Sequence, residues 1–105
     1  MSNERLKQLR EFYEQDPSDP FNAYALALEY QKVDVQKAAE FFEILLTNHA
    51  DYLPTYYHAA KFFQDRGDRD RAINTYETGI SLARRLGDQK AQRELKSAYD
   101  ELIFE

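Results

Sequence analysis

AYALALEYQKVDVQKAAEFFEILL (residues 23–46) and YYHAAKFFQDRGDRDRAINTYETGI (residues 56–80) are two copies of one pattern, and their repetition decides the fold. Each copy holds two apolar stripes with helical spacing, separated by a short polar turn. The first stripe recurs at an offset of 33 residues and the second at 34, so the one-residue difference falls in the turn. A helix–turn–helix unit with this period predicts a stacked helical repeat. The matched pairs are Ala23 and Tyr56, Leu26 and Ala59, Ala27 and Ala60, Tyr30 and Phe63, Ala38 and Ala72, and Phe42 and Tyr76.

Apolar stripes with the same spacing lie on both sides of the two copies. They consist of Leu6, Leu9, Phe12 and Tyr13 before the copies and Ala91, Leu95, Ala98 and Leu102 after them. No stretch alternates apolar and polar residues as a half-buried strand requires, so the pattern predicts an all-α chain. Its six helices are expected near residues 2–15, 20–32, 35–48, 53–66, 69–86 and 89–103.

Proline, glycine and aspartate fall where these helices are expected to begin or end. Asp19 is positioned to cap a helix that starts at Pro20, and Pro54 lies near the start of another helix. Gly67 and Gly87 are each followed by an aspartate. Glycine tolerates the left-handed geometry that closes a helix, and the aspartate can accept the free amides of the next helix.

Gly79 is the exception, because it lies inside a strongly periodic helical segment. Glycine is unfavourable in a helix interior, so its presence there calls for a packing reason. We expect it to mark a close crossing of two helices that only a small residue permits.

The second copy resembles the signature of the tetratricopeptide repeat family. Aromatic and small residues follow the order of that signature at Tyr56, Ala59, Ala60, Phe63, Gly67, Ala72, Tyr76 and Gly79. The first copy departs from it at Ala23, Val33 and Leu45, where the family usually has a large aromatic residue, the turn glycine and a small residue. The resemblance covers residues 5–103 and implies a right-handed α-α superhelix, as in the small free-standing tetratricopeptide repeat proteins of bacteria.

The stretch before the first copy also fits this frame, because Leu9, Phe12 and Pro17 have the spacing of the second helix of a unit and its terminal proline. We therefore expect a single domain over residues 1–105. Its parts are a half-unit helix at 1–18, a first full unit at 19–52, a second full unit at 53–87 and a capping helix at 88–105. Terminal helices of this kind cover the apolar faces that two units alone would leave open.

The composition favours a soluble helical protein and argues against several classes of partner. Aliphatic and aromatic residues make up 43% of the 105 residues, charged residues make up 31%, and the net charge is −5. An acidic chain is a poor candidate for nucleic acid, which requires concentrated lysine and arginine. There is no cysteine, no signal-like apolar run and no stretch long enough to span a membrane, so a cytoplasmic location without membrane contact is expected.

The sequence also carries no recognisable catalytic or metal-binding motif. His49 falls at a predicted helix end, where an imidazolium complements the helix dipole, and His58 lies on a different helix. Asp34 and Asp68 lack the ligand number and glycine turn of a calcium loop and are better explained as helix caps. We therefore predict no catalytic residue, no metal, no cofactor and no enzymatic activity.

The resemblance places a binding face on the first helix of each unit, on the side away from the packing stripe. The candidate residues on these helices are Tyr24, Leu28, Gln31, Tyr57, Lys61 and Gln64. The final helix would continue the face through Arg93 and Lys96. Two tyrosines, a leucine and several cations would suit a protein or peptide segment with acidic and apolar residues. The alternatives are that these positions are ordinary solvated ones, or that the chain is a structural protein that forms a homo-oligomer.

One use of the family is excluded by residue type. Chaperone-binding members grip a terminal carboxylate with a lysine and asparagines on these helices. This sequence has Tyr24, Leu28 and His58 at the corresponding positions. Binding of chaperone tails is therefore not expected.

Overall fold

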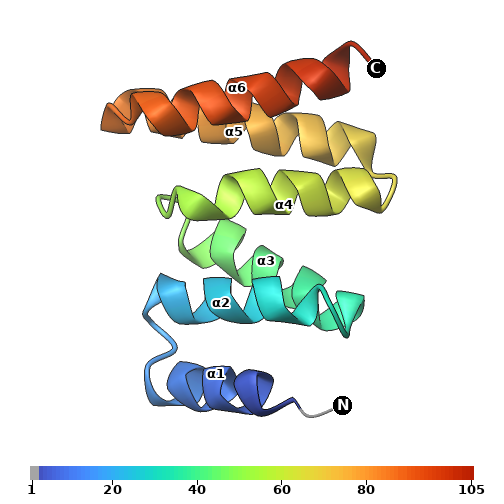
Figure 1. Ribbon diagram of the computed structural model, residues 1–105. Coiled ribbons are helices and arrows are strands. Elements are labelled where there is room, and N and C mark those ends of the chain that lie inside the picture. The colour runs from blue at the N-terminus through green and yellow to red at the C-terminus, as the bar shows by residue number, and fades with distance from the viewer. Residues whose placement is uncertain (1–2) are drawn as a thin grey trace. The chain divides into compact units, whose positions relative to one another are not determined.

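The computed structural model describes residues 3–105, and all regular secondary structure within that range is helical, as the sequence predicts. The six helices are α1 (Glu4–Gln15), α2 (Pro20–Tyr30), α3 (Val35–Asn48), α4 (Pro54–Asp65), α5 (Arg69–Leu86) and α6 (Gln89–Ile103) (Figure 1). Helix α1 packs on α2, α2 on α3, α4 on α5, and α5 on α6. The chain divides into two compact units, a first that ends at Tyr52 and a second at Leu53–Glu105. The first contains α1 to α3 and the second contains α4 to α6.

The predicted helix boundaries are close to the observed ones. The ranges 35–48, 69–86 and 89–103 agree with α3, α5 and α6 at both ends. The helix expected at 20–32 ends two residues earlier, and the one expected at 53–66 is shorter by one residue at each end. The predicted start at residue 2 lies outside the described residues, and α1 begins at Glu4.

Aspartates begin four of the helices by accepting hydrogen bonds from free backbone amides. Each side chain satisfies an amide that has no partner within its helix. The pairs are Asp19 with the amide of Phe21, Asp34 with Lys37, Asp68 with Arg71 and Asp88 with Ala91, at 3.0, 3.2, 3.3 and 3.0 Å. The predicted aspartate caps are therefore confirmed, and Pro20 is the first residue of α2, as predicted.

The change of offset from 33 to 34 arises from two different turns. Between α4 and α5, Gly67 adopts a left-handed φ of 83°, and the amide of Asp68 donates to the carbonyl of Phe63, five residues back. Between α2 and α3, the amide of Asp34 donates to the carbonyl of Tyr30, four residues back. No non-glycine residue from 3 to 105 has a positive φ, so the shorter turn tolerates Val33 where the longer turn uses glycine.

The core of the second unit is built around a very close approach of α4 and α5. A Cβ atom placed on Gly79 would lie 2.6 Å from the Cβ of Tyr56 and 3.3 Å from Cδ1 of Leu95. All three residues are buried. Gly79 therefore marks a tight helix crossing, as expected, and α6 covers the same place through Leu95.

The equivalent positions of the first unit carry the reverse pair of sizes. Ala23 corresponds to Tyr56, and Leu45 corresponds to Gly79; both Ala23 and Leu45 are fully buried. A small residue on the first helix and a larger one on the second keep the total volume similar while exchanging which helix supplies it. Cores tolerate such volume-conserving exchanges well. Two departures from the repeat signature thus compensate for each other.

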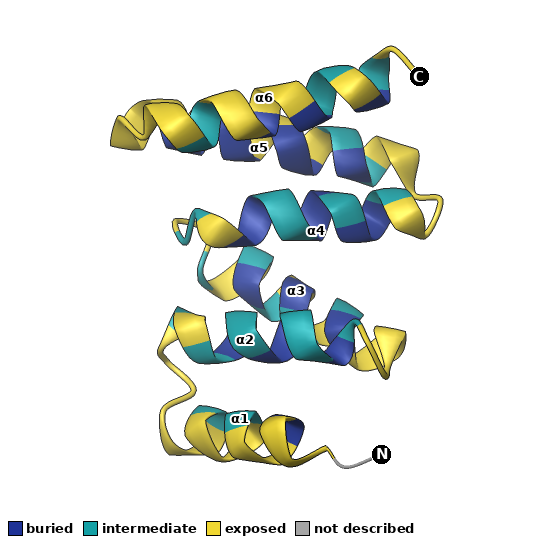
Figure 2. Ribbon diagram, viewed as in Figure 1, coloured by how far each residue is buried: buried dark blue, intermediate teal, exposed yellow. Residues whose placement is uncertain are grey.

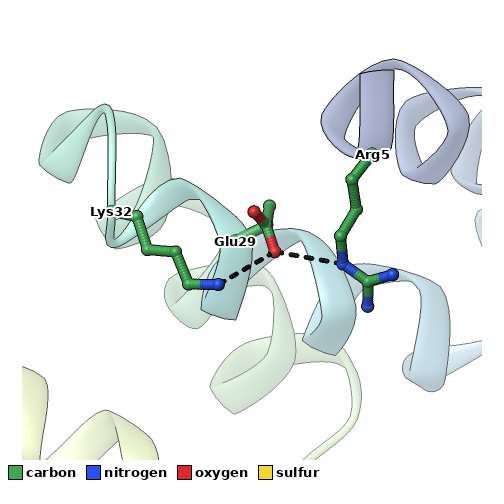
Figure 3. A network of polar contacts seen from close by, with 3 residues as sticks. All are labelled: Arg5, Glu29 and Lys32. Carbon is green, nitrogen blue, oxygen red and sulfur yellow. Dashed lines mark hydrogen bonds and ion pairs between the residues drawn. The ribbon is translucent and has the colours of Figure 1, made fainter. Parts of the chain in front are cut away.

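Helix α1 is attached to the first unit through few buried side chains. Leu6 is buried, whereas Phe12, expected in the apolar stripe, is 56% exposed because no helix covers its side of α1 among the described residues. Most of α1 is exposed in Figure 2. Polar contacts add to the attachment: Glu29 of α2 accepts from Arg5 of α1 at 3.2 Å and pairs with Lys32 at 3.4 Å (Figure 3). Such exposed pairs stabilise by at most about 1 kcal/mol each.

We predict that Gly79→Ala lowers the free energy of unfolding by about 1–3 kcal/mol, because the added methyl group overlaps the Tyr56 side chain. Alanine favours helix by about 1 kcal/mol over glycine, so the sign of the effect isolates the packing clash. Chemical denaturation followed by circular dichroism measures it. Ser81→Ala, at an exposed position of the same helix, is the control and should change stability by less than about 0.5 kcal/mol. An unchanged or raised stability of Gly79→Ala would contradict the close crossing.

Thr55 supplies a second stability prediction, because its buried side-chain oxygen has no hydrogen-bond partner among residues 3–105. Thr55→Val replaces that hydroxyl with a methyl of similar size and should stabilise the chain by about 1 kcal/mol. Thr75 is the matched control, since its Oγ1 donates to the carbonyl of Arg71 at 2.7 Å. Thr75→Val should give no gain, because it loses that bond. Equal shifts of the melting temperature in the two variants would contradict the difference between the unbonded Thr55 hydroxyl and the bonded Thr75 hydroxyl.

Candidate functional site

The second unit has a small groove between α4 and α6. Its α4 wall comes from Tyr57 and Lys61, one helical turn apart, and its volume is about 220 Å³. Its α6 wall consists of Glu94, Ser97, Ala98 and Glu101. These four positions have the spacing i, i+3, i+4 and i+7, so they share one side of the helix. The structure therefore brings two of the predicted binding residues together with a wall that the sequence analysis did not name.

Of the three charged side chains in this groove, only the lysine has a hydrogen bond, ion pair or ring contact with another described side chain. The Lys61 ammonium lies 5.8 Å from the centroid of the Tyr57 ring, a distance at which a cation is attracted to the ring face. Glu94 and Glu101 have no hydrogen bond or ion pair with any residue in the described chain 3–105. The groove thus holds one cation that is already placed over an aromatic ring and two carboxylates that are available.

Arg93 and Lys96 lie on a different side of α6. They line a shallow depression of about 620 Å³ together with Gln89, Gln92, Ser97 and Asp100. Lys96 Nζ is paired with Asp100 at 3.0 Å, one turn along the helix. Ser97 lines both hollows, but neither Arg93 nor Lys96 lines the groove that contains Tyr57. The two cations and the tyrosine do not share a groove.

Sequence reasoning continued the binding face onto the last helix through Arg93 and Lys96, and it missed Glu94 and Glu101. The buried stripe of α6 contains Ala98, and Glu94 and Glu101 stand four residues before it and three after it. The helical spacing around that small residue was the available signal. It shows that both glutamates flank the stripe, but which flank lies beside α4 is decided by the tertiary structure.

The predicted residues of the first unit lie along α2 and at its end. Tyr24 and Leu28 are half-buried on α2, and Gln31 is half-buried at its C-terminal cap. The Tyr24 ring meets the Tyr52 ring edge-on at 5.7 Å between centroids and lies 6.4 Å from the Phe21 ring. Burial raises the pKa of Tyr24, and Tyr52 adds to this effect. Tyr24 is therefore part of an aromatic cluster and not an isolated surface side chain.

The carboxylate of Asp19 lies near this cluster. Burial, followed by the negative charge of Asp19, raises the pKa of the Tyr52 hydroxyl. An aromatic cluster beside a carboxylate is a surface that attracts cations, through the ring faces and through the charge.

Gln64, the last candidate of α4, is tied to the core. Its Oε1 accepts a long hydrogen bond of 3.5 Å from the hydroxyl of Tyr76 on α5. Burial, with smaller contributions from Tyr57, Asp65 and Glu101, raises the pKa of Tyr76 to about 12. The tyrosine stays protonated and acts as the donor at every physiological pH. Gln64 thus supports the packing of α4 on α5.

The two histidines have different settings. His49 is the C-cap of α3, as expected, and His58 is half-buried on α4 beside the Tyr57 ring. Among residues 3–105, no three His, Cys, Asp or Glu side chains are grouped so that they could hold a metal ion. Within the same range, no helix is both long and apolar enough to cross a membrane.

His58 generates a prediction for the pH dependence of stability. Burial lowers the pKa of its imidazole from 6.5, so the unfolded chain binds this proton more readily than the folded chain. The His58 contribution therefore makes stability fall as the pH drops through 6.5 toward the lowered value. His58→Gln should lose that part of the decline between neutral and mildly acidic pH, in urea denaturation at a series of pH values. His49→Gln keeps His58 and should retain it; identical pH profiles for wild type and His58→Gln would refute the assignment.

Comparison with known proteins identifies structural relatives. The solution NMR structure of a tetratricopeptide repeat domain protein from Salinibacter ruber matches with a TM-score of 0.78 and 43% identity, over 83% of this chain and 89% of that chain. A crystal structure of such a domain from the same organism matches with a TM-score of 0.76 and 42% identity, over 81% and 97%. A protein of Bordetella parapertussis shares the fold, with a TM-score of 0.80 and 22% identity over 98% and 90%. No protein-family model matches the chain, and a search of curated proteins finds no match.

Proposed function

Because this chain belongs to the tetratricopeptide repeat family, we propose that it binds a segment of another protein in the groove between α4 and α6. The proposal rests on one observation: Tyr57 and Lys61 of α4 line a single groove together with residues of α6. A half-buried tyrosine offers a large contact area at a low cost in conformational entropy. Partner segments are commonly anchored through such side chains.

The size of the groove favours a protein segment over a small molecule. Pockets for drug-sized ligands and cofactors usually exceed about 300 Å³ and are mostly apolar. This groove is smaller, at about 220 Å³, and four of its six lining residues are charged or polar besides Tyr57. It has room for one or two side chains of a longer segment that continues over the surface.

The first unit offers a second contact surface on the corresponding helix. Tyr24 precedes Tyr57 by 33 residues, the period of the repeat, and both are half-buried. With Leu28 and Gln31, Tyr24 completes the proposed binding residues of α2. We propose that this α2 surface, taken by itself, also binds a protein segment through its tyrosine.

A homo-oligomer is the second candidate function, and the exposed phenylalanines of the first unit favour it. Phe12 and Phe21 are each 56% exposed. Asn22, the neighbour of Phe21 in the chain, donates from its Nδ2 to the carbonyl of Phe12 at 3.3 Å. Exposed large apolar side chains favour interaction with a partner surface. A copy of the same chain could cover them and leave the α4–α6 groove without a separate ligand.

The test is a selection of random twelve-residue peptides displayed on phage against the immobilised full chain. Selected peptides are then measured by fluorescence anisotropy on the wild type, Tyr57→Ala and Phe104→Ala. We expect Tyr57→Ala to weaken binding about tenfold or more, as removal of an interface anchor does. Phe104 is 83% exposed and lies outside the groove, so Phe104→Ala should bind as the wild type does.

Two other results would contradict binding in the α4–α6 groove. Equal binding by wild type and Tyr57→Ala would place the ligand elsewhere on the chain. No selected peptide, together with a dimer in sedimentation analysis that Phe12→Ser dissociates, would favour the homo-oligomer. Circular dichroism of each variant verifies that the helical fold is kept.

A further inference from the structure

We infer that the partner segment is basic, and that its lysine or arginine side chains bind Glu94 and Glu101 in the α4–α6 groove. This inference rests on the proposed function and adds the chemistry of the partner to it. It is the opposite of the acidic partner that the sequence analysis favours. The difference follows from which residues of α6 the fold turns toward α4.

Both carboxylates of the groove are available to a ligand. Glu94 and Glu101 are exposed, line the same groove, and form no ion pair or hydrogen bond within residues 3–105. The single cation of the groove, Lys61, lies over the Tyr57 ring. A basic segment would meet two available carboxylates and one like charge, whereas an acidic segment would meet two repelling charges and one lysine.

The cations that were expected to face the partner line a different hollow of α6. Lys96 is paired with Asp100 at 3.0 Å, and both line the depression on the other side of α6. Arg93 lines that depression as well. An acidic partner segment bound beside Tyr57 would therefore not reach these two charges in the same hollow.

The spacing of the two carboxylates determines the spacing of the cations that would bind them. Glu94 and Glu101 are seven residues apart on one side of a helix, so their backbones are separated by about 10 Å along the axis. Three residues of a polyproline II segment make one full turn and span about 9 Å, so residues i and i+3 lie on the same side of it. A segment of that conformation with basic residues at positions i and i+3 would place one cation near each carboxylate.

The first unit adds charge of the same sign. Residues 1–52 carry ten aspartates and glutamates against five lysines and arginines, so this unit accounts for the entire net charge of −5. The cluster of Tyr24 and Tyr52 beside Asp19 also favours a cation. Both tyrosine sites proposed for binding thus have carboxylates beside them.

The experiment uses the peptides selected on the full chain. We expect lysine and arginine to be enriched in them over the starting library, with aspartate and glutamate depleted. Fluorescence anisotropy of one selected peptide then compares Glu94→Gln, Glu101→Gln and Lys61→Gln with Glu105→Gln. The last variant removes the same charge from the same unit outside the groove.

The expected changes have opposite signs. Each groove glutamine variant should weaken binding about two- to fivefold, the range of an exposed ion pair. Lys61→Gln should strengthen binding, because it removes a like charge from beside the ligand. Glu105→Gln should leave affinity unchanged. Affinity of the wild type should fall with added salt, and less steeply in the double Glu94→Gln, Glu101→Gln variant.

The inference and the proposed function fail in different ways. Selected peptides that are enriched in aspartate and glutamate, or that bind the groove glutamine variants as tightly as the wild type, would overturn the basic partner. The binding function would stand in that case if Tyr57→Ala still released the peptides. A chain that selects no peptide at all would overturn both.

Discussion

The close approach of α4 and α5 at Gly79 is the constraint on which the second unit depends. A glycine in the middle of an 18-residue helix costs about 1 kcal/mol relative to alanine, and its position is explained by the Tyr56 side chain that occupies the space of its missing Cβ. Leu95 of α6 reaches the same point. The crossing thereby sets how α4, α5 and α6 lie against one another, and with them the two walls of the groove.

The first unit solves the same packing problem with different residues. Ala23 and Leu45 replace the aromatic residue and the glycine, and both are fully buried. Its turn does without a left-handed residue by closing one residue earlier. A degenerate repeat signature is therefore compatible with one fold, because what is conserved between the units is the volume between two helices and the caps at their ends.

Helix α6 has two roles in the second unit. Leu95, Ala98 and Leu102 are buried where α6 packs on α5, which is the role that a terminal helix serves in a repeat protein. The acidic flank of the same stripe then forms one wall of the groove beside Tyr57 and Lys61. Capping the core and shaping the proposed binding site are thus properties of adjoining positions on one helix. The charge of that flank determines which partner chemistry the groove favours.

The sequence alone determined the helices, their caps, the turn glycines and the crossing at Gly79, because each depends on residues close in the chain or on spacing repeated within it. The exposure of Phe12 was not predicted, since an apolar residue in a stripe is buried only if another helix covers it. The groove was predicted only on its α4 side. Which flank of α6 faces α4 depends on the rotation of α6 about its own axis, and that rotation is set by how Leu95 packs near Gly79. Only the tertiary structure could therefore place Glu94 and Glu101, and not Arg93 and Lys96, beside Tyr57.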